Sequence, residues 1–132
     1  MTGIIKVNEL QGRTTAGNIT VTSEGGAATQ SLQQGLAKVW ANLNGTGTIA
    51  LNDSLNVSSV SDIGTGTYDF TFSNVFNNSN WSAGGVIGQG GDRQLGGGAA
   101  FTISVFRAAI YNTGTALEDS DDTCINIHGD LA

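Results

Sequence analysis

The sequence predicts a mainly β fold: an antiparallel, jelly-roll-like β-sandwich with one short amphipathic helix and an extended N-terminal arm. Apolar and polar residues alternate through residues 45–72, as strands with one buried face and one solvated face require. The same alternation recurs in residues 100–111 and 123–130. Only residues 32–43 change to an apolar spacing of four, three and four, which is the period of a helix.

The stretch from 45 to 72 organises the prediction. It consists of two β segments joined by a polar, glycine-bearing turn at residues 61–66. Val60 falls on the opposite parity from Val57, and a bulge near Ser58 and Ser59 would return it to the buried face. The apolar residues that define the two buried rows are Ile49, Leu51, Leu55 and Val57 in the first segment and Tyr68, Phe70 and Phe72 in the second.

Residues 1–26 hold an arm and the first strands. Aliphatic residues recur in residues 1–10 and again in 17–22, with an irregular link at 11–16. One interpretation makes both segments strands of the domain's own sheet. The other makes the first an arm that adds a strand to a neighbouring chain, because backbone pairing needs only an exposed edge. We expect the arm to dock the protein on a partner through Ile4, Ile5, Val7 and Leu10.

A helix is predicted within residues 27–45. Ser31 and Gln34 match a capping box at its start, and Gly45 stands where a C-terminal cap belongs. The apolar face packs on the β core, or it meets copies of itself at a symmetry axis, and the sequence leaves both open. As an oligomer interface it consists of Leu32, Leu36, Val39 and Leu43.

The body of the sandwich is predicted to extend over residues 46–132, so that the chain forms one compact domain. Residues 73–82 form a polar link anchored by Val75, Phe76 and Trp81, and the glycine-dense residues 84–98 predict a long loop. Residues 100–111 form two strands or one bulged strand.

The last part of the chain predicts a turn, an acidic turn and a closing strand. The turn covers residues 112–115. Carboxylates at 118, 119, 121 and 122 lack the alternate spacing of a calcium loop, so we expect a solvated acidic turn. In the closing strand, Ile125 and Ile127 face one way.

Composition excludes several classes of function. The net charge is −6, with only five Lys and Arg, which argues against binding to nucleic-acid phosphates or anionic membrane surfaces. There is no run of apolar residues for a membrane span and no signal-peptide pattern. The single Cys124 excludes an internal disulfide framework.

The sequence predicts no enzyme, no cofactor and no metal. Cys124 and His128 are four residues apart on one strand, which separates them by roughly 13 Å, too far for a thiolate–imidazole pair. No other nucleophile, carboxylate pair or metal cluster stands out.

The high glycine content of the chain favours an oligomer. The chain has 20 glycines and no proline, and each glycine adds backbone entropy to the unfolded state, roughly 0.4–1 kcal/mol relative to alanine. A domain is stable by only about 5–15 kcal/mol, so burial in an assembly would offset this cost.

Four segments carry a resemblance to a known family. GRTTAGNITVTSEGG, LQQGLAKVWANLNGTGTIALNDSLNVSSV, GTGTYDFTFSN and the terminal INIHGDLA resemble a β-rich domain of virion proteins from marine and cyanobacterial tailed bacteriophages, often found at the C-termini of tail-fibre-like proteins. The resemblance covers nearly the whole chain and is patchy between residues 78 and 98. Its motifs are structural, so it carries over no functional residue.

The resemblance implies a non-enzymatic virion structural protein that forms a homotrimer. Because the domain begins almost at Met1, we expect a capsid decoration (cement) protein on the virion surface, assembled in the host cytoplasm and docked on the major capsid protein. The alternative is a short tail-fibre or tail-tip protein that contacts a host receptor or glycan. A third class is a carbohydrate-binding or carbohydrate-hydrolysing module, since two Trp and two Tyr could stack on sugars.

Overall fold

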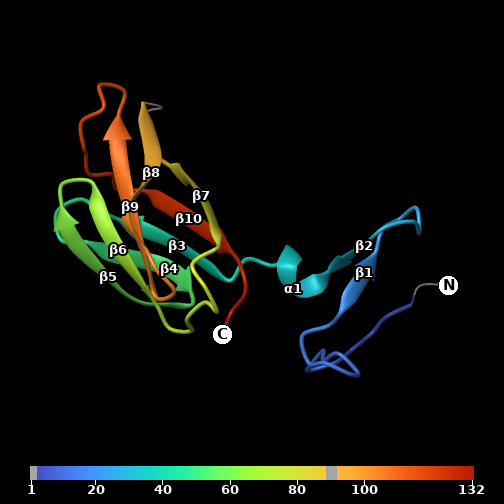
Figure 1. Cartoon of the computed structure of the whole chain (residues 1–132). Helices are drawn as coiled ribbons and strands as arrows, with labels where there is room; N and C mark the ends of the chain where they lie inside the picture. The colour runs from blue at the N-terminus through green and yellow to red at the C-terminus, as the bar shows by residue number, and fades with distance from the viewer. Residues whose placement is uncertain (1–2, 89–91) are drawn as a thin grey trace. The chain divides into compact units, whose positions relative to one another are not determined.

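Two four-stranded antiparallel sheets pack face to face in the C-terminal part of the chain (Figure 1). The computed structural model describes residues 3–88 and 92–132. The chain divides into two units, one extending to Leu36 and one covering Ala37–Ala132. The fold is mainly β and sandwich-like with one short helix, as the alternation predicted.

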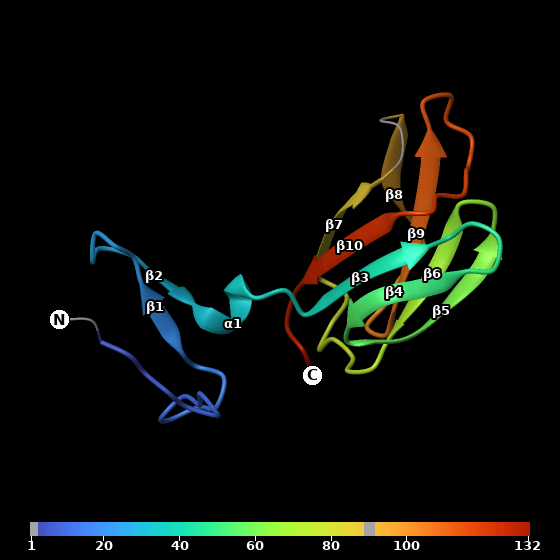
Figure 2. The same cartoon turned by 180° about the vertical axis from the view of Figure 1, so that it is seen from behind.

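The first sheet has the strand order β4-β3-β10-β7 and the second β5-β6-β9-β8 (Figure 2). Every neighbouring pair is antiparallel. Because β7 and β8 end their sheets, each has a strand partner on one side only among the described residues. The bounds of the eight strands are β3 Val39–Asn44, β4 Ala50–Leu55, β5 Val57–Gly64, β6 Thr67–Phe72, β7 Ser82–Ile87, β8 Arg93–Phe101, β9 Val105–Asn112 and β10 Thr123–His128.

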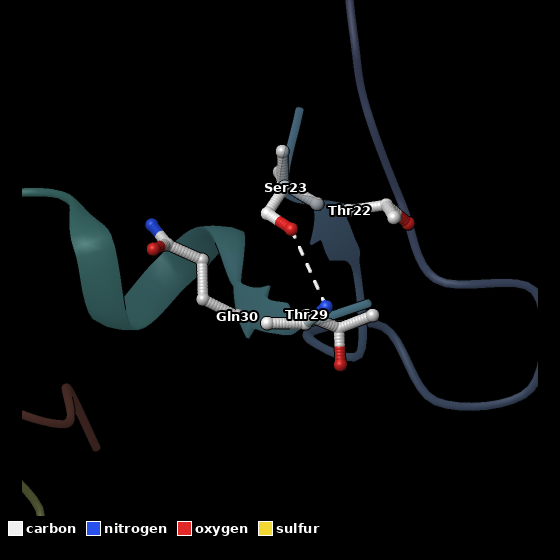
Figure 3. A pocket seen from close by; sticks show the side chains of 6 residues that line it. Thr22, Ser23, Thr29 and Gln30 are labelled. Atoms are coloured by element: carbon white, nitrogen blue, oxygen red, sulfur yellow. Dashed lines mark hydrogen bonds between the residues drawn. The ribbon is translucent and has the colours of Figure 1, made fainter. Parts of the chain in front are cut away.

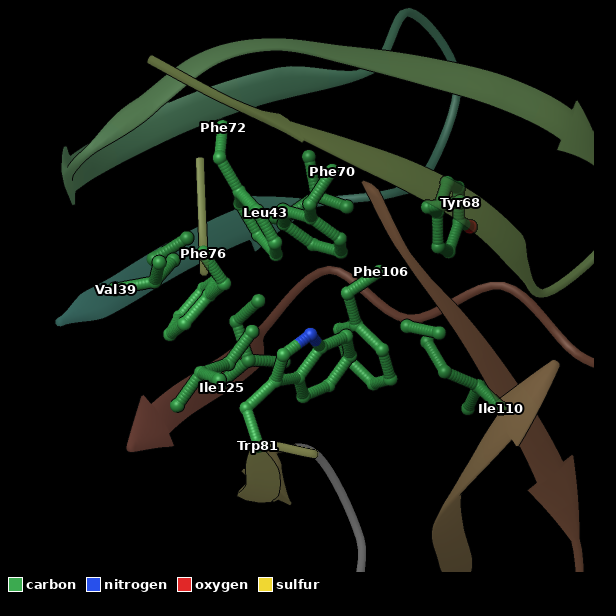
Figure 4. Close-up of a cluster of buried hydrophobic side chains, with 13 residues drawn as sticks. Val39, Leu43, Tyr68, Phe70, Phe72, Phe76, Trp81, Phe106, Ile110 and Ile125 are labelled. Carbon is green, nitrogen blue, oxygen red and sulfur yellow. The ribbon is translucent and has the colours of Figure 1, made fainter. Parts of the chain in front are cut away.

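The sandwich core is rich in aromatic rings (Figure 4). Trp81 stacks on Phe101 with ring centroids 4.9 Å apart, and its indole N–H donates to the Thr102 carbonyl at 3.1 Å. Phe76 and Trp81 are buried, so two of the three predicted anchors of the link after β6 are confirmed, whereas Val75 is exposed. The core cluster consists of Val39, Ala41, Leu43, Tyr68, Phe70, Phe72, Phe76, Trp81, Phe106, Ala108, Ile110, Ile125 and Ile127.

The stretch from 45 to 72 contains three strands rather than two. The first predicted segment divides at Asn56, where φ is +60°, and β4 and β5 belong to different sheets. The predicted bulge is confirmed, because the register with β6 shifts between Val57 and Ser59. Val57 and Val60 therefore both pack against the core.

The predicted helix is wrong over most of its length. Helix α1 covers only Leu32–Gly35, with Ser31 as its N-cap accepting from the Gln34 N–H at 3.4 Å. Val39 and Leu43 lie on strand β3, fully buried in the sandwich core, and Gly45 follows that strand. These two residues are not part of an exposed oligomer interface.

The physical reason for this error is a coincidence of spacing. Val39, Ala41 and Leu43 alternate along β3 and all point into the core. Leu32 and Leu36 happen to precede them at helical intervals, but Leu36 is exposed. The cross-strand pairs of Val39 with Ile127 and of Leu43 with Thr123 place the segment in the sheet.

The glycine-dense loop predicted at residues 84–98 is also wrong for its described part. Residues 84–87 lie in β7 and residues 93–98 lie in β8. Residues 89–91 of that prediction lie outside the described residues. The two-strand alternative for 100–111 is correct, since the chain turns between Phe101 in β8 and Val105 in β9, and the turn after β9 and the closing strand β10 are confirmed.

The N-terminal unit has little regular structure. Strand β1 (Thr20–Thr22) pairs with β2 (Thr29–Ser31), and α1 follows. Residues 3–10 form no strand, so the interpretation that they belong to the domain's own sheet is not supported. No residue from 3 to 36 is buried.

Candidate docking sites

The N-terminal segment Gly3–Leu10, here called the arm, exposes its aliphatic side chains. All four predicted docking residues are largely solvent-accessible: Ile4 is 77% exposed, Ile5 85%, Val7 56% and Leu10 61%. After the arm, the chain closes a small loop in which the Gly12 N–H donates to the Ala16 carbonyl at 2.8 Å. Aliphatic side chains in this state gain free energy from any apolar surface that covers them.

The β1–β2 hairpin carries a shallow pocket of about 120 Å³ (Figure 3). The Ser23 hydroxyl accepts a hydrogen bond from the Ala28 N–H at 3.3 Å and closes the hairpin turn. No charged side chain lines this pocket, so it has no group to hold an ion. Its lining residues are Val21, Thr22, Ser23, Ala28, Thr29 and Gln30.

A second concave surface lies between β7 and β8, and we call it the edge groove. Its volume is about 510 Å³. Leu95, Phe101 and Phe106 give it apolar walls, and Gln94 is its polar side chain. The backbone between them is bare, because Gly84 and Gly85 of β7 and Gly96 and Gly97 of β8 also line it.

The predicted docking residues and the predicted helical interface do not form one surface. Leu32 and Leu36 belong to the N-terminal unit, whereas Val39 and Leu43 are core residues of the sandwich. The edge groove was missed because its glycines predicted a loop. Leu95 stands between Gln94 and three glycines, so the sequence offers no alternation that would have marked this strand.

Cys124 and His128, the two residues weighed as a catalytic pair, lie four residues apart on strand β10. Among the described residues no group of three or more His, Cys, Asp and Glu side chains could hold a metal ion. Burial raises the pKa of the Cys124 thiol, and the hydrogen bond and charge of Asp122 raise it further. The thiol therefore stays protonated near neutral pH and is a poor nucleophile.

The acidic turn is structural rather than solvated. Asp119 Oδ1 accepts the Gly66 N–H at 2.6 Å and lies 2.8 Å from the Tyr68 hydroxyl. Glu118 forms an ion pair with Arg93. Asp122 Oδ1 accepts from the Asn42 side chain at 2.9 Å. These carboxylates hold the chain between β9 and β10 against the sandwich, and none of these contacts indicates a ligand.

The aromatic residues considered as sugar platforms are mostly unavailable. Trp81 is 7% exposed and Tyr68 is fully buried. Trp40 is 37% exposed, and Tyr111 is half-buried. The faces of Trp81 are occupied by Phe101 and by other core rings, so this ring cannot stack on a sugar.

Comparison of the chain with protein-family models, with curated proteins and with solved structures gives no match. Among the described residues no helix has the length and apolar character needed to cross a membrane.

Proposed function

We propose that the protein is a non-enzymatic structural component of a tailed-bacteriophage virion: a homotrimeric capsid decoration protein that docks on the major capsid protein through its arm. Three observations support the proposal. The segments quoted above resemble phage virion domains, the second unit is a β-sandwich, and the arm presents exposed aliphatic side chains outside that sandwich.

The observation that carries the proposal is the exposure of Ile4, Ile5, Val7 and Leu10. Burying each such side chain contributes roughly 1.5–3 kcal/mol. Ordering the backbone costs about 1–2 kcal/mol per residue, so over the whole arm the two terms are comparable. Side-chain burial alone would bind weakly. Strand pairing and the avidity of several linked arms would supply the rest, which is why an oligomer suits this mode of docking.

Deletion of residues 2–10 tests the proposal. Virions that lack their own copy of the protein are incubated with full-length or truncated protein, and bound protein is quantified after the virions are sedimented. We expect the truncated protein to keep its β-type circular dichroism spectrum and to lose binding. The matched control is Ile63→Glu, which alters an exposed aliphatic residue of β5 and should bind normally.

Two results would contradict the proposal. Equal binding by the truncated protein would place the docking surface elsewhere. Failure of the truncated protein to fold would make the arm part of the fold. The copy number per virion then separates the two virion roles, since a decoration protein is present in many copies and a tail component in few.

A further inference from the structure

The outer edge of β7 lacks the devices that usually protect a sheet edge. Natural edge strands carry charges, proline or bulges that prevent pairing with other chains. Strand β7 has the sequence SAGGVI, with no charged residue and no proline, and its register with β10 is unbroken. Figures 1 and 2 show β7 next to β8 at one side of the sandwich. An unprotected edge beside an apolar groove is a surface suited to an added strand.

The edge groove restricts what can pair there. Its lining contains no charged side chain, so a charged segment would find no partner. Its glycines leave the backbone of β7 and β8 accessible, and its walls are the side chains of Leu95, Phe101 and Phe106. The fitting occupant is an extended segment with small or aliphatic side chains on one face.

Residues 3–7 of the arm of the same chain have that pattern. Neighbouring residues of a strand point to opposite faces, so Gly3, Ile5 and Val7 share one face, which Glu9 continues beyond Val7, and Ile4 and Leu10 share the other. Ile5 and Val7 would lie roughly 7 Å apart with nothing between them on their face. Lys6 and Asn8 interrupt the opposite face between Ile4 and Leu10. The arm therefore carries two aliphatic side chains on each face, and each pair gains free energy from an apolar surface that covers it.

We propose that the arm of one copy pairs with the β7 edge of a second copy and places Ile5 and Val7 in the edge groove. Ile4 and Leu10 then remain on the outer face for the virion partner. The pairing is heterologous, because two different surfaces, the arm of one copy and the edge groove of the next, are in contact. Heterologous contacts close into a ring when the rotation that relates successive copies allows it. The inference rests on the proposed function in one respect, since it assigns the contact that holds the proposed homo-oligomer together.

Sedimentation velocity of full-length variants tests the pairing. We expect the wild-type protein to sediment as an oligomer at micromolar concentration. Ile5→Asp combined with Val7→Asp should shift it to monomer. Ala83 of β7 also lines the edge groove, and Ala83→Glu should separately do the same. The matched controls are Ile4→Asp combined with Leu10→Asp on the opposite face, and Ile63→Glu on the far edge strand β5. Both controls should remain oligomeric.

A cross-linking experiment covers the case in which a charged variant fails to fold. A Val7→Cys protein is mixed with an Ala83→Cys protein, both also carrying Cys124→Ser, and the mixture is oxidised. We expect a disulfide-linked pair, and a much lower yield with Ile4→Cys in place of Val7→Cys.

A wild-type monomer, oligomers that survive both groove-directed variants, or equal cross-linking from positions 4 and 7 would each overturn the inference. Loss of virion binding by the Ile4 and Leu10 variant with its oligomer intact would support the outer-face assignment. If the wild-type protein forms the arm-paired oligomer but does not bind virions, the proposed function fails while the pairing stands.

Discussion

Tyr68 connects the end of β3 to the acidic turn through a single hydroxyl group. Its ring is fully buried, and its oxygen lies 2.8 Å from both the Gly45 carbonyl and Asp119 Oδ1. The hydroxyl donates its proton to one of these oxygens. A Cβ at Gly45 would lie 2.3 Å from the Tyr68 oxygen, so glycine is required there for the close approach.

Removing this hydroxyl should destabilise the sandwich. We expect Tyr68→Phe to lower the free energy of unfolding by about 1–3 kcal/mol, because buried acceptors lose a donor. Urea denaturation followed by circular dichroism measures the change. Tyr111→Phe, which alters a half-buried tyrosine, is the control and should have little effect. Equal effects of the two substitutions would contradict a specific role for the Tyr68 hydroxyl.

Stability should also fall at alkaline pH. Burial raises the pKa of Tyr68, and the hydrogen bond to Asp119 raises it further. The folded state favours the protonated phenol. The stability that Tyr68 contributes is therefore fully present below the unfolded-state pKa of about 10 and is lost progressively as the pH rises above that value. The raised pKa of Cys124 acts with the same sign from about pH 8.5 upward.

Urea denaturation at a series of pH values measures this dependence. We expect the wild-type free energy of unfolding to decline as the pH rises above about 9. Cys124→Ser should delay the start of the decline, and Tyr68→Phe should reduce its slope above about pH 10. A Tyr68→Phe protein with the same slope as wild type would show that other groups cause the decline.

At the scale of elements, the β5–β6 hairpin depends on the backbone of Gly66. Its φ is +62°, and a Cβ there would lie 2.6 Å from the Glu118 nitrogen and 2.8 Å from the Ile110 carbonyl oxygen. The Gly66 carbonyl also accepts the Ile110 N–H at 2.7 Å. The turn is therefore tied to β9 as well as to its own strands.

Alanine at this turn should be costly for two separable reasons. Gly47 provides the comparison, because its φ is +63° but nothing lies within 4 Å of a Cβ added there. We expect Gly47→Ala to cost about 1–2 kcal/mol for the left-handed conformation. Gly66→Ala should cost clearly more, because backbone atoms must also move. Thermal or urea unfolding measures the loss of stability in the two variants. Equal losses would show that the close contacts of a Cβ at position 66 add nothing to the cost of the left-handed conformation.

Strict alternation was the feature of the sequence that predicted the strands correctly. The bulge between Val57 and Ser59 could be predicted because two valines of opposite parity both had to reach the core. The edge strand β7 could not be predicted, because its glycines have no side chains that could form an alternating pattern. Strand β3 was hidden because its alternation coincided with helical spacing from α1 onward. The pairing of β3 with β10, which resolves that ambiguity, joins segments far apart in the chain.

The candidate docking sites, like the strands, could be predicted from the sequence only in part. The four aliphatic residues of the arm stand out in the sequence because their context is polar, and the structure shows that they are exposed; their role in docking stays a prediction. The edge groove requires β7 and β8, from different sheets, to lie together, and no local pattern encodes that arrangement.

At the scale of the whole molecule, the sandwich unit contains the entire hydrophobic core cluster. The described residues of the first unit, 3–36, include no buried residue. A unit that holds its own core is expected to fold independently.

A fragment of residues 37–132 should therefore fold without the N-terminal unit. We expect cooperative urea unfolding, a β-type circular dichroism spectrum and a monomeric state in sedimentation, since the arm is absent. An insoluble or non-cooperative fragment would show that the first unit completes the fold. A fragment that still forms the wild-type oligomer would show that the arm is not the contact.

The stacking of Trp81 on Phe101 has a spectroscopic consequence. Trp81 is almost completely shielded from solvent, whereas Trp40 is 37% exposed, so the two indoles should emit at different wavelengths. Phe101 both stacks on Trp81 and lines the edge groove. In a Trp40→Phe background, the fluorescence of a single indole would report whether that groove is filled, without any attached label.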